Sequence, residues 1–229
     1  MAPGLTGAVI ASRTLVRGDG APVAAVVIRP DDSDANRATL RDTATAWRQL
    51  AGSLGATAST SAVHRVYFAS DVAQIASGTL GDPDARLLAA QTADGRVLLG
   101  LAVYRFDPDG PRWCLGLLAT SPVNVPGYPG ALTRQQVRGI GTFLLLAFLD
   151  DTVVTGCTVV ELEPLDAAAA TFYRARGFSP TGHDHDLRLS CPDARVVAAD
   201  LHATPLDADY WVATADRDDL ARVNPQWMR

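Results

Sequence analysis

The chain has 229 residues, of which 48% are hydrophobic and 20% charged, and its formal net charge is -5. This is ordinary globular composition with room for a full hydrophobic core. An acidic balance without a basic cluster argues against a nucleic-acid partner. Residues 1–20 lack the pattern of a signal peptide, and no apolar run reaches the about 20 residues that cross a bilayer. Three scattered cysteines without a C-x-x-C pair favour reduced thiols in the cytoplasm.

The N-terminal third predicts one or two strands followed by two helices. The alternation "LTGAVIASRTLV" is typical of either an added strand or a loosely attached arm, and "PVAAVVIRP" predicts a buried strand. Ser33 is a suitable N-cap for a helix over residues 34–51. A second helix is expected over residues 61–77, although "HRVYFA" within it also fits a strand.

The middle of the chain predicts an antiparallel meander over residues 85–119. Its runs are "ARLLAAQT", "RVLLGLAVYRF" and "RWCLGLLAT", each separated from the next by a turn signal. A loop rich in proline and glycine follows over residues 121–133, and then an apolar helix up to Leu149.

The C-terminal third continues with the strand "CTVVELEP" and the helix "DAAAATFYRARG", which Asp166 can cap and Gly177 can end. The stretches "FSPTG" and "DLRLS" suggest a final hairpin. In the tail, "RVVAAD" and "YWVAT" are candidate strands.

This order predicts an α+β domain in which helices flank a mixed, mostly antiparallel sheet. We expect an N-terminal extension over residues 1–22, the main domain over residues 23–190, and a C-terminal extension over residues 191–229. The last of these could pack on the core.

The stretch "QVRGIGTFLL" places two glycines, Gly139 and Gly141, in front of the apolar helix. Glycine lets backbone N–H groups approach an anion closely, and the start of a helix adds a partial positive charge. A pyrophosphate would suit such a cradle. A glycine pair before a helix is, however, more often a simple turn.

A second motif, "DAAAATFYRARGF", lies one strand further along. Ala169, Phe172 and Tyr173 share one face of its helix because they stand three and four residues apart. Core packing explains the first two. The phenol of Tyr173, on the face next to the cradle, could donate a proton to a leaving group.

The two motifs together resemble those of the GNAT superfamily of N-acyltransferases, which pairs Q/R-x-x-G-x-G/A with a later N-x-x-A-x-x-F-Y-x-x-x-G-F. The resemblance covers about residues 23–190. The matching residues are Gln136, Gly139 and Gly141 in the first motif and Ala169, Phe172, Tyr173, Gly177 and Phe178 in the second.

The resemblance implies the GNAT fold and an acyl thioester held between the strands "RWCLGLLAT" and "CTVVELEP". The amine would attack the thioester directly, Tyr173 would protonate the departing sulfur, and a strand bulge in "CLGLLAT" would bind the carbonyl oxygen. Backbone N–H groups of residues 137–141 would hold the pyrophosphate. The implied donor site comprises Gln136, Val137, Arg138, Gly139, Ile140, Gly141, Thr142, Asp166 and Ala169.

Four features depart from the family pattern. Val137 stands where glycine is frequent, Asp166 stands where asparagine is usual, the strand "RWCLGLLAT" has no glutamate base, and residues 121–135 are inserted before the cradle. An aspartate can cap the helix equally well, but it adds charge near the pantetheine. The insertion lies where a substrate or partner would arrive.

Several side chains are candidates for the general base. Glu161 and Glu163 face the same side of their strand and could deprotonate the amine, although a solvated edge or an ion pair explains them as well. His183 and His185 in "GHDHD" could be bases, but a polar turn accounts for them too, and we expect no metal site. Cys114 is more typical of a small buried residue than of an acyl carrier.

The main hypothesis is therefore an N-acyltransferase that moves an acyl group, by default acetyl from acetyl-CoA, to the amine of a small molecule. An alternative is amide formation in bacterial natural-product biosynthesis, with the acyl group delivered on the phosphopantetheine of an acyl carrier protein. A third reading is a non-catalytic acyl-CoA-binding module. A homodimer is plausible because the helix over residues 139–149 is apolar all round, but burial within the domain explains this equally.

Overall fold

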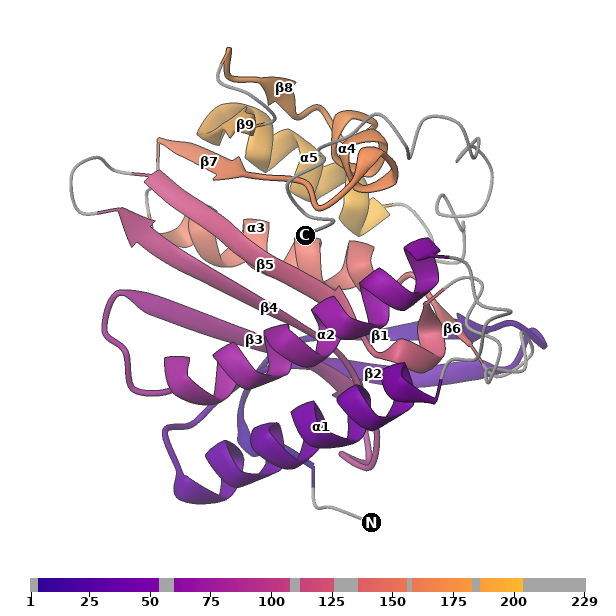
Figure 1. The fold of residues 1–229 in the computed structure, drawn as a ribbon. Coiled ribbons are helices and arrows are strands. Elements are labelled where there is room, and N and C mark those ends of the chain that lie inside the picture. The colour runs from indigo at the N-terminus through magenta and orange to yellow at the C-terminus, as the bar shows by residue number, and fades with distance from the viewer. Residues whose placement is uncertain are drawn as a thin grey trace.

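The computed structural model describes residues 4–53, 60–107, 112–125, 136–155, 158–182 and 186–203. Within these ranges the chain forms five α-helices, one 3-10 turn and nine strands (Figure 1). The strands are β1 (Gly7–Arg17), β2 (Pro22–Pro30), β3 (Ala85–Thr92), β4 (Leu98–Asp107), β5 (Arg112–Thr120), β6 (Val137–Arg138), β7 (Val159–Leu162), β8 (Ser179–Pro180) and β9 (Leu187–Ser190). The helices are α1 (Asp34–Gly52), α2 (Thr60–Thr79), η1 (Pro122–Asn124), α3 (Ile140–Val154), α4 (Ala167–Arg174) and α5 (Cys191–Ala203).

The strands form one mixed sheet in the order β6-β1-β2-β3-β4-β5-β7-β9-β8. Among the described strands, β5 and β7 are the parallel pair and the others are antiparallel. The predicted α+β class, the β3–β4–β5 meander and the final β8–β9 hairpin are confirmed. The alternation near the N-terminus is a strand of the sheet, because β1 pairs along its length with β2.

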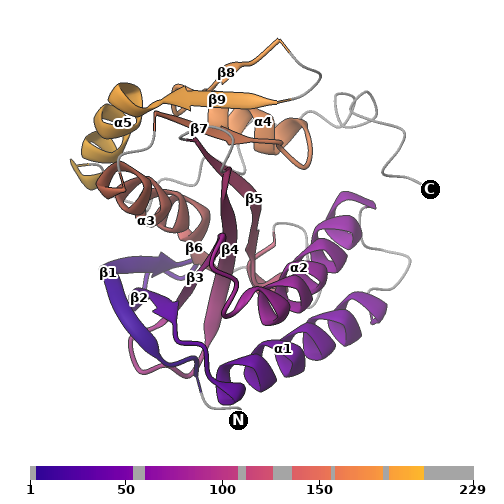
Figure 2. The same cartoon turned by 90° about the vertical axis from the view of Figure 1, so that its left-hand side faces the viewer.

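Helices cover both faces of the sheet (Figure 2). α1 and α2 bury one set of strand residues, including Leu87 and Leu101, while α3, α4 and α5 bury the other set, including Leu88 and Ala102. Neighbouring strand residues point to opposite faces, so each central strand contributes to two cores. This double burial explains why β3 and β4 read as nearly continuous apolar runs.

Both helices of the first layer form as predicted. Ser33 caps α1 by accepting a hydrogen bond from the Asn36 N–H, and Leu40, Ala44 and Trp47 are buried along one face. The stretch "HRVYFA" lies inside α2 and is helical. Its alternative assignment as a strand is therefore wrong.

The prediction that "RVVAAD" is a strand is also wrong, because this stretch belongs to α5. Ser190 directly precedes the helix, accepts a hydrogen bond from the Asp193 N–H and donates one to the Asp193 carboxylate. This reciprocal pair, with Pro192 in the first turn, starts a helix. The stretch "YWVAT" lies outside the described residues.

α3 is buried all round, and every side chain from Ile140 to Leu149 is shielded from solvent. It packs on the sheet with one side and against α5 with another. The domain itself therefore accounts for the helix being apolar on every face, which removes that argument for a dimer. None of the helices in the described ranges is long and apolar enough to span a membrane.

Candidate active site

The sheet opens between β5 and β7. The two strands pair in parallel from Arg112 to Leu115 and from Val159 to Leu162. β7 then ends while β5 continues to Thr120, so the strands diverge, as Figure 1 shows. The expected split between "RWCLGLLAT" and "CTVVELEP" is present.

A β-bulge lies in β5 at the start of this split. On β4, Val103 pairs with Leu117 and Tyr104 pairs with Leu115, which leaves Gly116 between them without a partner residue. A bulged residue is released from the regular ladder. The predicted bulge in "CLGLLAT" is therefore present, and Gly116 lines the pocket at the split.

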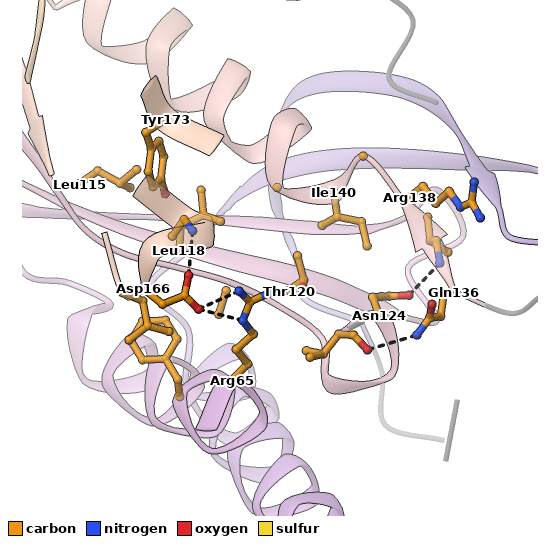
Figure 3. A pocket seen from close by; sticks show the side chains of 18 of the residues that line it. Arg65, Leu115, Leu118, Thr120, Asn124, Gln136, Arg138, Ile140, Asp166 and Tyr173 are labelled. Carbon is orange, nitrogen blue, oxygen red and sulfur yellow. Dashed lines mark hydrogen bonds and ion pairs between the residues drawn. The ribbon is translucent and has the colours of Figure 1, made fainter. Parts of the chain in front are cut away.

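A pocket occupies the opening between the diverging strands (Figure 3). Side chains from α2, the second half of β5, η1, the cradle before α3 and the β7–α4 junction surround it. Its lining residues are Arg65, Phe68, Leu115, Gly116, Leu118, Ala119, Thr120, Asn124, Val125, Gln136, Val137, Arg138, Gly139, Ile140, Gly141, Glu163, Leu165, Asp166, Ala169 and Tyr173. Both sequence motifs thus contribute to one pocket.

The cradle is built by β6 and the start of α3. Gly139 is the N-cap of α3 and has a φ of 79°, in the left-handed region that glycine adopts without strain. The N–H groups of the first helical turn have no acceptor within the helix. The Ile140 and Gly141 N–H groups therefore belong to a helix start that borders the pocket, where an anion would be favoured.

The first part of the cradle already has protein partners. The Val137 N–H donates to Asn124 Oδ1 at 2.8 Å, and Gln136 Nε2 donates to the Val125 carbonyl at 3.2 Å (Figure 3). β6 also pairs with β1. In this structure the Val137 N–H, one of the groups expected to hold a phosphate, thus donates to Asn124.

Tyr173 lies in α4 with its side chain at the pocket (Figure 3). Its ring packs edge-on against Phe172 and Phe178, at centroid distances of 5.0 and 5.5 Å. Burial raises the pKa of the phenol well above its ordinary value, although the positive charge of Arg176 counteracts part of this effect. A phenol is protonated at neutral pH even at its ordinary pKa of about 10, and this is the form that a proton donor needs.

Asp166 caps α4 and also forms an ion pair. Its Oδ1 accepts a hydrogen bond from the Ala169 N–H at 2.7 Å. Its Oδ2 accepts two hydrogen bonds from Arg65 on α2, from Nε at 3.0 Å and from Nη2 at 2.7 Å. Both charged side chains line the pocket.

The two candidate glutamates have different surroundings. Glu163, just beyond the end of β7, lines the pocket and is exposed. Glu161 lies outside the pocket lining and pairs with Arg112, with Glu161 Oε2 and Arg112 Nη1 3.2 Å apart. Glu161 thus forms the ion pair considered for it, and Glu163 is the one of the two glutamates that lines the pocket.

Two further candidates, Thr142 and Cys114, lie away from the pocket lining. Thr142 is buried, and its Oγ1 accepts a hydrogen bond from Arg176 Nη2 at 3.0 Å. Burial, together with the charge of Glu161, raises the pKa of the Cys114 thiol, which opposes its use as a nucleophile. His183 and His185 lie outside the described residues, and in the described part no group of side chains could hold a metal ion.

Arg65 and Asn124 are pocket residues that sequence reasoning missed. Neither belongs to either motif, and Arg65 reaches its partner across 101 residues of chain. The sequence holds no local signal for either residue, because their partners lie in other elements.

No family model and no curated protein matches the chain. Among solved structures, apo FdhC, described as a nucleotide-linked sugar GNAT, aligns with a TM-score of 0.54 at 8% identity over 88% of this chain and 99% of that one. The chain therefore has the GNAT fold, as the resemblance implied. The alignment shows the fold alone.

Two other solved structures align less closely. A Desulfovibrio desulfuricans protein of the GNAT family has a TM-score of 0.49 at 18% identity, over 73% of this chain and 99% of its own. The PaiA N-acetyltransferase of Thermoplasma acidophilum, in complex with coenzyme A, has a TM-score of 0.45 at 16% identity, over 72% and 98%. Likeness at this level carries no argument about activity.

Proposed function

We propose that the protein is an N-acyltransferase that moves an acyl group from acyl-CoA to the amine of a small molecule. The observation that carries this proposal is the meeting of both motifs in one pocket at the split between β5 and β7. The start of α3 provides the anion cradle there, and α4 provides a protonated Tyr173. Reduced thiols at Cys114 and Cys191 suit a cytoplasmic reaction.

The pocket suits direct transfer. With the thioester between the strands, the backbone at the Gly116 bulge faces the carbonyl oxygen and stabilises the negative charge that develops on it. The amine nitrogen forms the new bond to carbon as the carbon–sulfur bond breaks. Tyr173 gives its proton to the leaving sulfur and regains one from solvent. The proton lost by the amine passes through water to Glu163.

A carrier-bound donor is the second candidate, and one contact favours it. Asn124 occupies the Val137 N–H, so the cradle offers fewer free donors to a nucleotide pyrophosphate. A phosphopantetheine arm on an acyl carrier protein has no such pyrophosphate. This donor would fit amide formation in natural-product biosynthesis.

Titration calorimetry with CoA, followed by mass spectrometry of product from a panel of acyl donors and amines, tests the proposal. We expect CoA to bind and an acyl-CoA to give an N-acyl product. If CoA does not bind and product forms only from carrier-loaded acyl groups, the donor is the acyl carrier protein and not acyl-CoA. Binding of CoA without product from any donor and amine would favour a non-catalytic acyl-CoA-binding module.

A further inference from the structure

We propose that Arg65 is a positioning residue that makes an aspartate usable at position 166 of the donor pocket. The inference goes beyond the proposed function, because it explains how one charged residue of the pocket depends on another. It rests on the proposed function for the repulsion between Asp166 and an anionic donor and for the donor-binding and kinetic measurements, but not for the stability measurement.

The two carboxylate oxygens of Asp166 have separate partners. Oδ1 accepts from the Ala169 N–H and fixes the first turn of α4. Oδ2 accepts from both Nε and Nη2 of Arg65, which lie on one edge of the guanidinium (Figure 3). The side chains are 18% and 17% exposed, so water screens the pair only in part.

The pair also connects two layers of the molecule. Arg65 is on α2, on one face of the sheet, and Asp166 begins α4, which packs into the core of the opposite face. The pairing of β5 with β7 ends at Leu115 and Leu162, before the chain reaches Asp166. The ion pair therefore bridges the split where the strands no longer do, and it holds the start of the helix that carries Tyr173.

The charges in the pocket explain why the ion pair between Arg65 and Asp166 is needed. A thioester donor with phosphate groups is anionic, and a mostly buried carboxylate in the same pocket would repel it and would itself lack solvation. A guanidinium with two hydrogen bonds to that carboxylate cancels most of its charge. An asparagine could cap α4 through its own oxygen and would carry no charge. Arg65 is thus required because residue 166 is an aspartate.

Four proteins test this dependence: the wild type, Arg65→Met, Asp166→Asn and the double variant. Methionine keeps the length of the apolar stem and removes the charge. Because breaking a buried charge pair leaves one charge without its partner, we expect Arg65→Met to weaken CoA affinity and lower kcat/KM about tenfold or more. Adding Asp166→Asn should restore both to within about threefold of the wild type, because no uncompensated carboxylate then remains. A double variant no better than Arg65→Met, or an Arg65→Met variant equal to the wild type, would overturn the inference.

Arg48→Met is the matched control. It removes the arginine of another ion pair to α2, that between Arg48 and Asp71, whose side chains are both more than half exposed. We expect CoA affinity and kcat/KM to remain at wild-type values, because exposed pairs contribute little.

Wild-type protein that neither binds CoA nor gives product would refute the proposed function separately. The inference would then be judged by urea unfolding of the same four proteins. The inference stands if the double variant regains the unfolding free energy lost in Arg65→Met. It is rejected if the loss in the double variant equals the sum of the losses in Arg65→Met and Asp166→Asn.

Discussion

In the proposed mechanism, Tyr173 is the acid and Glu163 the base, and one side chain is buried while the other is exposed. Tyr173 is 7% exposed, and its phenol is protonated at neutral pH, as an ordinary phenol is. Glu163 is exposed at the rim, where a carboxylate is solvated and can pass protons to water. The leaving thiolate and the incoming amine would therefore meet groups suited to opposite proton transfers.

Replacement of Tyr173 by phenylalanine removes the proton donor and keeps the ring contacts with Phe172 and Phe178. We expect kcat to fall by about a hundredfold while the KM for the donor stays near that of the wild type, because general acid catalysis acts on the transition state. Steady-state kinetics with the identified donor and amine measures both. Tyr67→Phe, on the exposed side of α2, is the control and should leave kcat unchanged. A Tyr173→Phe variant with wild-type kcat would refute the role of the phenol.

At the level of single residues, the sequence predicts contacts between residues of one motif, and it misses contacts between residues far apart in the chain. Asp166 could be recognised as a helix cap because its partner, the Ala169 N–H, is three residues away. Arg65 and Asn124 could not, since their partners become neighbours only when α2 and η1 pack against the split. Glu161 and Glu163 look equivalent in the sequence. They differ because β7 ends between them, at Leu162.

The cradle depends on how closely α3 approaches the sheet. Gly100 on β4 lies beneath the start of α3, and a Cβ there would stand 2.8 Å from the Ala119 carbonyl oxygen and 3.0 Å from the side chains of Ile140 and Leu144. A glycine at this position thus permits the contact. The cradle is held against the strands by this close packing as well as by β6.

Gly100→Ala should therefore disturb both the core and the cradle. Overpacking at such a contact costs about 1–3 kcal/mol of unfolding free energy, and the displaced start of α3 should weaken CoA binding. Urea unfolding and titration calorimetry measure the two effects. Gly78→Ala, at a position in α2 where a Cβ meets nothing within 4 Å, should be neutral or slightly stabilising. Unchanged stability of Gly100→Ala would show that α3 can shift without cost.

At the level of elements, strand and helix periodicity predicted most of the order of elements along the chain, and the double burial of β3 and β4 left apolar runs that were easy to recognise. The prediction failed for "RVVAAD", which was a candidate strand and is part of α5. The local start signals of Ser190, Pro192 and Asp193 determine the outcome there, and the burial of Ala194, Ala198 and Leu201 follows helical spacing.

A network around Asp151 joins the last turns of α3 to three adjacent strands of the molecule. Its carboxylate accepts hydrogen bonds from Arg29 on β2, from Arg86 on β3 at 2.7 Å and from Tyr104 on β4 at 2.5 Å. Burial alone would raise the pKa of Asp151, but these hydrogen bonds and the two positive charges outweigh burial and lower it. The ionised carboxylate therefore stabilises the fold.

This network gives the stability of the whole domain an acid dependence. A carboxyl whose pKa is lower in the folded state contributes fully above its unfolded value of about 4 and loses its contribution as pH falls through the folded value. Asp151→Asn should lower the unfolding free energy at neutral pH by about 2 kcal/mol, since it breaks a largely buried charge network whose arginines are partly exposed. Its stability should also fall less steeply below about pH 4.

Urea unfolding across a pH series measures both effects. Asp150→Asn is the matched control, because Asp150 neighbours Asp151 in sequence but is 41% exposed and pairs with His202. It should change stability only slightly. Parallel acid curves for the wild type and Asp151→Asn would exclude Asp151 as the source of the acid dependence.

The pairing of β6 with β1 has a consequence for the order of folding. Val16 pairs with Arg138 and Arg17 with Val137, so the strand that leads into α3 is aligned by a strand near the N-terminus, more than 100 residues earlier in the chain. Contacts between such distant segments form late, because the loop between them must close first. The donor cradle would then be among the last parts of the domain to form. A chain that lacks its first 22 residues would keep both sequence motifs and still have no strand against which to align the cradle.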